Sequence, residues 1–288
     1  MAEEQLPASN NGEALTVLPH LSDEAINALI LDENGNPIDS NTPAVLRGSL
    51  TMSRALAESA HGLTLNESRV MMLAMRCVDP RVSPYKYARD GYVKVRVTAA
   101  QFAELANLES TDGYTPRAAY DGLKAACDKI YERTASWNEG KTQVKMRWVF
   151  KAQYHEGEAW AEICFSPDMT QHIFMLGQRF VRYRLELARG LRSVYSSNLL
   201  RLLMTQKDTG FKTITLEDFR RTMEVPDKYR YGDIKRYAIV APVKELNDKA
   251  DMRIEWKETK RGRSVHSLQF TFEMLRPEDK GRQAELDL

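Results

Sequence analysis

The chain has 288 residues, 43% of them hydrophobic and 28% charged, with a formal net charge of +1 at pH 7. This length suits two domains of roughly 100 to 120 residues, each able to bury its own core. The three cysteines have no CxxC spacing, no apolar run approaches the roughly 18 residues of a membrane span, and the N-terminus lacks the features of a signal peptide. These observations argue against disulfide-rich, membrane and secreted classes, so we expect a cytoplasmic protein without a membrane partner.

Charge is distributed unevenly along the chain. Residues 1–48 contain eight Asp/Glu and one Arg, a net charge of −7, which leaves +8 on the remaining residues. This arm is rich in turn formers, and we expect it to be acidic and disordered, with one short helix at residues 22–31. An acidic arm before a basic body is compatible with nucleic-acid binding and equally with a solubilising extension.

Residues 50–165 are expected to form a first domain in the order helix, strand, helix, helix, hairpin. Helical spacing runs over residues 50–78, and YVKVRV (92–97) alternates as a strand. Thr98 and Gln101 form a capping-box pattern at the start of the next helix, and Thr115-Pro116 begins the helix 117–133. VKMRWVF (144–150) and AWAEICF (159–165) are the two strands of the predicted hairpin.

The same order of elements returns in residues 193–273. VTAAQFAELANL (97–108) matches ITLEDFRRTMEV (214–225) at a constant offset of 117, which pairs Thr98 with Thr215 and Phe102 with Phe219. Chance similarity of two short amphipathic helices is the alternative, but the shared order favours a domain duplication. Between the copies, SPD (166–168) begins a helix, and QRFVRYRLELARGLRS (178–193) is predicted to be a long basic connector helix, whose arginines alternatively form a solvated face.

Residues 229–273 have the pattern of a helix followed by a basic hairpin. On a helical wheel, the helix 234–247 has an apolar side and a polar side. The strands 252–257 and 265–272 are joined by a turn in which Gly262 can take a positive φ. Residues 228–263 contain eleven Lys/Arg against six Asp/Glu, a local net charge of +5. Such a unit suits DNA, although a solvated helix beside an ordinary hairpin is the alternative.

Nine short stretches of the sequence resemble those of a known family, and their order and spacing, taken together, are specific to it. They are LTLNESR (63–69), FSPD (165–168), FVRYRL (180–185), SVYS (193–196), LLRLL (199–203), DIKR (233–236), KELN (244–247), MRI (252–254) and KRGR (260–263). The chain thereby resembles the iteron-binding plasmid replication initiators, the RepA/RepE-type Rep proteins of theta-replicating plasmids, over about residues 50–273. Two features depart from that pattern: Pro242 within the last helix, where we expect a kink, and the acidic arm.

The resemblance implies an α+β fold of two tandem winged-helix domains, related by internal duplication and joined by a long helix. We expect residues 1–48 to be the disordered arm, 49–165 the first winged helix for dimerisation and an auxiliary DNA contact, 166–275 the connector helix and main DNA-reading domain, and 276–288 a disordered tail. It further implies a protein that binds iterons at a plasmid origin as a monomer, promotes origin opening and recruits host replication proteins, the initiator and the helicase. A dimer would bind the operator and repress the protein's own promoter, and the complex would be associated with the plasmid or nucleoid of a bacterium.

We expect Arg236 to read bases, because Arg suits guanine and the first turns of a recognition helix point into the major groove. Lys235 is the weaker candidate, since the helical wheel places it on the side of the helix that packs against the domain. Lys257, Lys260, Arg261 and Arg263 of the hairpin are expected to contact phosphates. The remaining candidates are Lys228, Arg230, Asp233, Tyr237 and Lys244 in the second domain, and Arg117 and Lys124 in the less basic helix of the first.

Catalytic functions have little support in the sequence. The five histidines are scattered without the His-x-His spacing of a rolling-circle initiator, and the chain has no GxxxxGK[ST] nucleotide-binding motif. We therefore expect no enzyme activity, no catalytic or metal-binding residues and no cofactor. The competing hypothesis is a winged-helix transcriptional regulator without a replication role.

Overall fold

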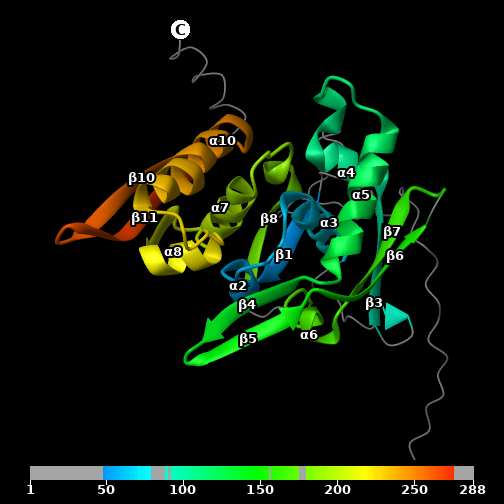
Figure 1. Cartoon of the computed structure of the whole chain (residues 1–288), viewed down its shortest axis with the longest axis horizontal. Helices are drawn as coiled ribbons and strands as arrows, with labels where there is room; N and C mark the ends of the chain where they lie inside the picture. The colour runs from blue at the N-terminus through cyan, green and yellow to red at the C-terminus, as the bar shows by residue number, and fades with distance from the viewer. Residues whose placement is uncertain (1–47, 79–87, 90–91, 156, 175–179, 276–288) are drawn as a thin grey trace, which may run out of the picture. The chain divides into compact units, whose positions relative to one another are not determined.

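The computed structural model describes residues 48–78, 88–89, 92–155, 157–174 and 180–275 (Figure 1). The predictions for the acidic arm before residue 48, including its short helix, and for the tail 276–288 lie outside the described residues. Within the described part of the chain, no helix is both long enough and apolar enough to cross a membrane.

Three helices of the first domain begin at side-chain caps, two of which the sequence predicts. α3 (Leu65–Arg76) starts after Thr64, which forms a capping box with Glu67, and α4 (Ala99–Ala106) starts after Thr98, which forms one with Gln101. α5 (Pro116–Ile130) follows the N-cap Thr115, with the proline in its first turn, where its missing N–H costs nothing. The capping predictions at Thr98 and Thr115 are confirmed.

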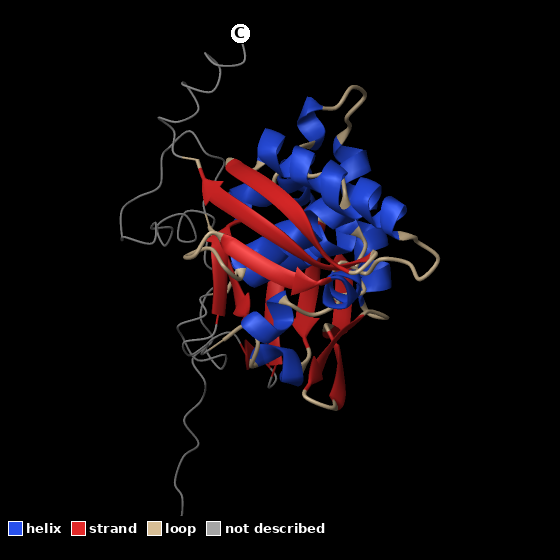
Figure 2. Cartoon of the chain, turned by 90° about the vertical axis from the view of Figure 1, so that its left-hand side faces the viewer, coloured by secondary structure: helices blue, strands red, loops and turns tan. Residues whose placement is uncertain are grey.

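One antiparallel sheet lies against these helices in the order β2-β3-β7-β6. It consists of β2 (Ala88–Arg89), β3 (Tyr92–Thr98), β6 (Val149–His155) and β7 (Trp160–Phe165). α5 packs on β6 and β7 (Figure 1). Figure 2, seen from the side of the second domain, shows most helices in blue gathered toward one side of the strands in red. Val95, Val97 and Ile163 are among the strand residues buried in this layer.

The second domain repeats this arrangement with α7 (Val194–Met204), β9 (Phe211–Thr215), α8 (Leu216–Thr222), a third helical stretch, β10 (Met252–Arg261) and β11 (Ser264–Met274). Its sheet order is β10-β11-β9, which corresponds strand for strand to β6-β7-β3 of the first domain. The third helical stretch consists of α9 (Tyr231–Asp233), η4 (Ile234–Val240) and α10 (Ala241–Lys249). Two tandem winged-helix domains of mixed helix and sheet are therefore confirmed.

The repeated residues occupy equivalent positions in the two domains. Thr98 caps α4 and Thr215 caps α8, each accepting a backbone hydrogen bond from the residue three positions later. Phe102 is 2% exposed and Phe219 is fully buried. The offset found in the sequence thus joins one cap and one core position of two copies of the same motif, which agrees with a duplication.

The long connector helix predicted for residues 178–193 is wrong. Residues from 180 on form β8 (Phe180–Arg184) and the short helix η3 (Leu185–Ala188), and β8 pairs with β1 (Ser49–Ser53). The reason is a period of two in FVRYR, since Val181 and Tyr183 are buried while the residues that alternate with them, Phe180, Arg182 and Arg184, are exposed. The helical prediction for residues 50–53 is also wrong. These residues form β1 by pairing with β8, a strand about 130 positions away in the sequence.

The first domain also carries a hairpin with no counterpart in the second. β4 (Thr134–Glu139) and β5 (Thr142–Arg147) lie between α5 and β6, whereas α10 leads almost directly into β10 (Figure 1). The segment VKMRWVF, predicted as a single strand, is divided between β5 and β6. Trp148 stands at the division, fully buried, and its Nε1 donates to the carbonyl of His61 at 2.9 Å.

Three short helices complete the fold, α2 (Arg54–Ala57), η2 (Leu108–Ser110) and α6 (Pro167–Thr170).

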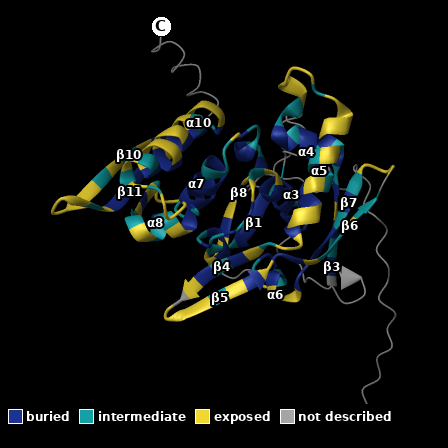
Figure 3. Ribbon diagram, in the orientation of Figure 1, coloured by how far each residue is buried: buried dark blue, intermediate teal, exposed yellow. Residues whose placement is uncertain are grey.

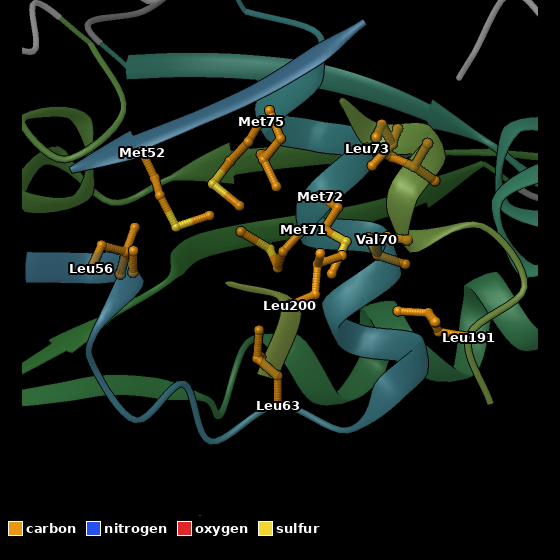
Figure 4. Close-up of a cluster of buried hydrophobic side chains, with 14 of the residues drawn as sticks. Met52, Leu56, Leu63, Val70, Met71, Met72, Leu73, Met75, Leu191 and Leu200 are labelled. Atoms are coloured by element: carbon orange, nitrogen blue, oxygen red, sulfur yellow. The ribbon is translucent and has the colours of Figure 1, made fainter. Parts of the chain in front are cut away.

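The hydrophobic core continues from one domain into the other. Figure 4 shows Met71, Met72 and Met75 of α3 gathered with Met52 and with Leu200 of α7. Methionine side chains adapt to irregular gaps, which suits a contact between elements of two domains. The described residues accordingly belong to one compact unit.

Candidate nucleic-acid interface

The third helical stretch of the second domain, residues 231–249, contains a π turn just before a proline. In a regular α-helix Pro242 would have to donate a backbone N–H to Ala238, and it has none to give. The π segment Ile234–Val240 widens the helix ahead of it, and Ala241 donates to the carbonyl of Arg236, five residues back. A π turn therefore stands ahead of Pro242, where a kink was expected.

This turn changes which residues face outward. An α-helix advances about 100° per residue, whereas a wider turn advances less, so consecutive side chains spread over a narrower arc. Lys235, Arg236 and Tyr237 are all exposed, while Ile234 and Ala238 are buried. The prediction that Lys235 points to the packed side is therefore wrong, because the wheel assumed regular α geometry. We call residues 231–249 the recognition helix.

The start of the recognition helix is fixed by two side chains. Oδ2 of Asp233 accepts a hydrogen bond from the backbone N of Arg230 at 3.0 Å, so this carboxylate serves as a helix cap. Arg220 of α8 donates to the carbonyls of Tyr229, Pro226 and Asp227 at 3.0 to 3.2 Å. The loop that presents Lys228 and Arg230 is thereby held to the preceding helix, and both of these side chains are exposed.

Glu258 joins the recognition helix to the hairpin β10–β11. Its Oε2 accepts from the hydroxyl of Tyr231 at 2.5 Å and lies 3.5 Å from Nζ of Lys235, while its Oε1 lies 3.6 Å from Nζ of Lys260. The hydrogen bond from Tyr231, with the two lysines, lowers the pKa of Glu258. Burial and this same carboxylate raise the pKa of Tyr231. One carboxylate therefore lies beside Tyr231 and two lysines that were expected to contact DNA, a contact that the sequence did not reveal.

The hairpin β10–β11 forms a basic wing. Its tip is a tight turn in which Gly262 has φ +64°, as the sequence predicts, and a Cβ added to this glycine would meet no atom within 4 Å. A β-bulge follows Thr259 and turns the tip relative to the rest of the ladder. The tip is exposed in Figure 3. The exposed cations of the wing are Lys257 further down β10 and Lys260, Arg261 and Arg263 near the turn.

The outer side of the recognition helix also presents apolar surface. Tyr237 is 43% exposed and Val240 is 46% exposed, which is unusual for large hydrophobic residues of a helix that packs on a domain core. The guanidinium of Arg236 lies 5.2 Å from the ring centre of Tyr237. An arginine beside apolar groups can contact guanine and the methyl group of thymine. Lys244 is exposed toward the end of the helix.

The first domain offers a weaker version of this surface. On α5, Nε of Arg117 lies 3.0 Å from Asp121, and Nζ of Lys124 lies over the ring of Tyr154 at 5.5 Å from its centre. The tip between β6 and β7 carries the exposed residue Glu158 where the second domain has its cations. The structure therefore does not bring Arg117 and Lys124 together with a basic wing.

No group of three or more His, Cys, Asp or Glu among the described residues is arranged to hold a metal ion. Burial raises the pKa of Cys127 to about 12 and, with help from Glu162, that of Cys164 to about 11. These thiols are therefore in the neutral form at ordinary pH.

Comparisons with known proteins agree with the geometry. The solved structure of the Pi initiator protein in complex with iteron DNA superposes with a TM-score of 0.65 at 19% identity, covering 78% of this chain and 96% of that chain. A WH1 domain of a replication protein isolated from a multiple sclerosis patient matches 36% of this chain and 74% of its own, at 24% identity and a TM-score of 0.26. Residues 49–204 match the family described as Initiator Replication protein, WH1, and residues 215–272 match Initiator Rep protein, WH2. Since these matches cover most of the sequence, the chain belongs to the family of initiator replication proteins.

Proposed function

We propose that this protein starts the replication of a plasmid by binding repeated double-stranded DNA sites, iterons, at the origin. The observation that carries the proposal is the exposed surface of the second domain, where Glu258 of the basic wing contacts Tyr231 and Lys235 of the recognition helix. The similar Pi initiator was solved with iteron DNA, and the same class of ligand suits this surface. The helix would enter the major groove while the wing neutralises phosphates.

The two domains would make different contacts with the DNA. Residues 166–275 would supply the main reading surface, with Arg236 and Tyr237 on the bases, Lys257, Lys260, Arg261 and Arg263 on phosphates, and Lys228, Arg230, Lys235 and Lys244 beside them. Asp233 would act mainly by capping the recognition helix. Residues 49–165 would add a weaker DNA contact through Arg117 and Lys124, since the hairpin beside them carries Glu158 at its tip in place of the wing's cations.

A dimer is the form that we propose for repression of the protein's own promoter. β6 is the last strand in the order β2-β3-β7-β6, and its Phe150 is 38% exposed. An outer strand with an exposed aromatic side chain is suited to pairing with a second copy. Burial of the first domain's strands within their own sheet remains the competing explanation for their apolar composition. The monomer would open the origin and engage the host initiator and helicase in the bacterial cytoplasm, acting by binding and not by catalysis.

The test separates initiation from regulation alone. A fragment carrying the gene's flanking DNA is placed on a vector that cannot replicate by itself, and the protein is supplied from a second, compatible plasmid. We expect the vector to be maintained with the wild-type protein and lost with Arg236→Ala. Footprinting on the same fragment checks binding. Protection of a promoter without maintenance of the vector would establish a winged-helix transcriptional regulator and contradict the proposal.

A further inference from the structure

One residue of the second domain holds a backbone conformation that its side chain does not favour. Glu224 follows α8 with φ +56°, in the left-handed region. Its counterpart at the offset of 117 is Asn107, the C-cap of α4, with φ +53°. Asparagine is enriched in this conformation, whereas glutamate gains nothing from it. A glutamate held there points to a task for its side chain.

That task is visible in its hydrogen bonds to the first domain. Oε1 of Glu224 accepts from the backbone N of His61 at 2.8 Å, and Oε2 accepts from the backbone N of Gly62 at 2.9 Å. Gly62 itself has φ +64°, and an added Cβ would come within 3.0 Å of the Thr134 carbonyl. Both carboxylate oxygens are therefore engaged by two successive amides more than 160 positions away in the sequence.

A buried arginine binds the backbone carbonyl groups of the same segment. Arg201 of α7 is 3% exposed, and its Nη1 donates to the carbonyls of Leu56, Ala57 and Ser59 at 3.4, 2.5 and 2.9 Å. Burial lowers the pKa of Arg201 to about 10, and attraction by Glu224 opposes this effect. We call Arg201 and Glu224, together with the segment 56–62 that they hold, the interdomain clamp.

Further contacts complete the clamp on both sides. Thr222 donates to the carbonyl of Glu58 at 3.0 Å, and Nζ of Lys212 lies 2.7 Å from the carboxylate of Glu58. On the side of the first domain, Ala60 and Ser136 exchange backbone hydrogen bonds of 2.9 and 2.8 Å. The segment therefore belongs to the first domain through β4, and the second domain grips it with α7, β9 and the end of α8.

We propose that Arg201 and Glu224 are positioning residues that fix the distance and rotation between the two DNA-reading surfaces, and thereby the spacing of the two half-sites within one DNA repeat. The inference rests on the proposed function, in which both domains contact one site. Each base pair inserted between half-sites lengthens the duplex by about 3.4 Å and turns it by about 34°. Two domains held rigidly fit one spacing, whereas two released domains tolerate several.

The experiment uses the full chain and a variant that spares the local backbone. Glu224→Gly removes the carboxylate while glycine accepts the left-handed conformation. Asn107→Gly makes the same backbone change in the first domain, and Glu217→Ala removes an equal charge from an exposed position of α8. The wild-type protein first selects its site from a randomised duplex pool, and footprinting locates the two half-sites. Duplexes with one, two and five extra base pairs between the half-sites are then compared by Kd.

We expect the wild-type protein and both controls to bind the lengthened duplexes about tenfold or more weakly than the selected site, and Glu224→Gly to lose most of this difference. Hydrogen exchange should show faster exchange of the His61 and Gly62 amides in Glu224→Gly alone. An equal loss of affinity at every spacing, unchanged protection of these amides, or a wild-type protein indifferent to spacing would each overturn the inference while leaving DNA binding intact. Failure of the wild-type protein to select any duplex would instead overturn the proposed function, and the inference with it.

Discussion

The two winged-helix domains have the same strand order and equivalent caps, yet their exposed surfaces differ in charge. The second domain carries three cations, Lys260, Arg261 and Arg263, around Gly262 at the tip of its wing, whereas the corresponding tip of the first carries Glu158. Arg117 of the first domain is paired with Asp121, while Arg236 of the second lies beside Tyr237. The buried pattern sets the fold of each copy, and the exposed residues, which the fold does not constrain, are free to differ in function.

The strongest test of the shared architecture concerns the aromatic residues at the offset of 117. Phe102→Ala and Phe219→Ala each remove a buried ring from equivalent helices, α4 and α8. We expect each to lower the free energy of unfolding by about 3 to 5 kcal/mol, measured by urea denaturation. Tyr131→Ala, at a residue 49% exposed, is the control and should change stability little. A large loss of stability for only one of the two variants would show that Phe102 and Phe219 do not occupy equivalent core positions in the two domains.

The wing provides the test of the difference in charge. Neutralising Lys260 and Arg261 together to Gln should lower the slope of log K against log salt by about 2, which is roughly fifty- to a hundredfold in affinity at 0.1 M salt, on specific and random duplexes alike. Glu158→Gln in the other wing is the matched change and should leave the slope nearly unaltered. An unchanged slope in the Lys260/Arg261 variant would place the wing away from DNA.

Base recognition should be strongest at the second domain's helix. Arg236→Ala is expected to cost about 1 to 3 kcal/mol on the selected site and little on random DNA, because the side chain is exposed on the outer side of the π turn. Arg117→Ala should cost less on both, because Asp121 already shares its charge. Equilibrium titrations of the wild-type protein and both variants on both duplexes measure the six binding constants. Equal losses on specific and random DNA for Arg236→Ala would refute its assignment to bases.

Local signals in the sequence predicted much of the fold and little of what joins its parts. Thr98 and Thr115 indicate their helices through neighbouring residues, and Gly262 indicates its turn, so these features were predictable. β1 and β8 pair over a long sequence separation, and no local pattern indicates such a partner. The two-residue alternation of FVRYR is visible in the sequence, but the connector was mistaken for a helix because its partner strand was not.

The candidate site shows the same division. The exposure of Arg236 and Tyr237 follows from a helical wheel, but that of Lys235 requires the π turn, for which Pro242 is only an indirect signal. Glu258 stands in a strand with ordinary alternation, and its link to Tyr231 exists only once helix and wing are packed together. Glu224 is similar, since its left-handed conformation and its partners in the first domain are both properties of the folded chain.

The last prediction compares the outer strands of the two domains and has the smallest expected effect. Phe150 of β6 and Phe211 of β9 are 38% and 46% exposed, and each lies on the last strand of its sheet. If the first domain alone supplies the dimer interface, Phe150→Lys should weaken dimerisation by about 1 to 2 kcal/mol, because a charge would be placed where a second copy packs. Phe211→Lys makes the same change on an outer strand of the second domain and should leave the dimer unaffected. Sedimentation equilibrium of the full chain measures both. A weakened dimer in Phe211→Lys, with Phe150→Lys unchanged, would move the interface to the second domain and remove the proposed division of labour.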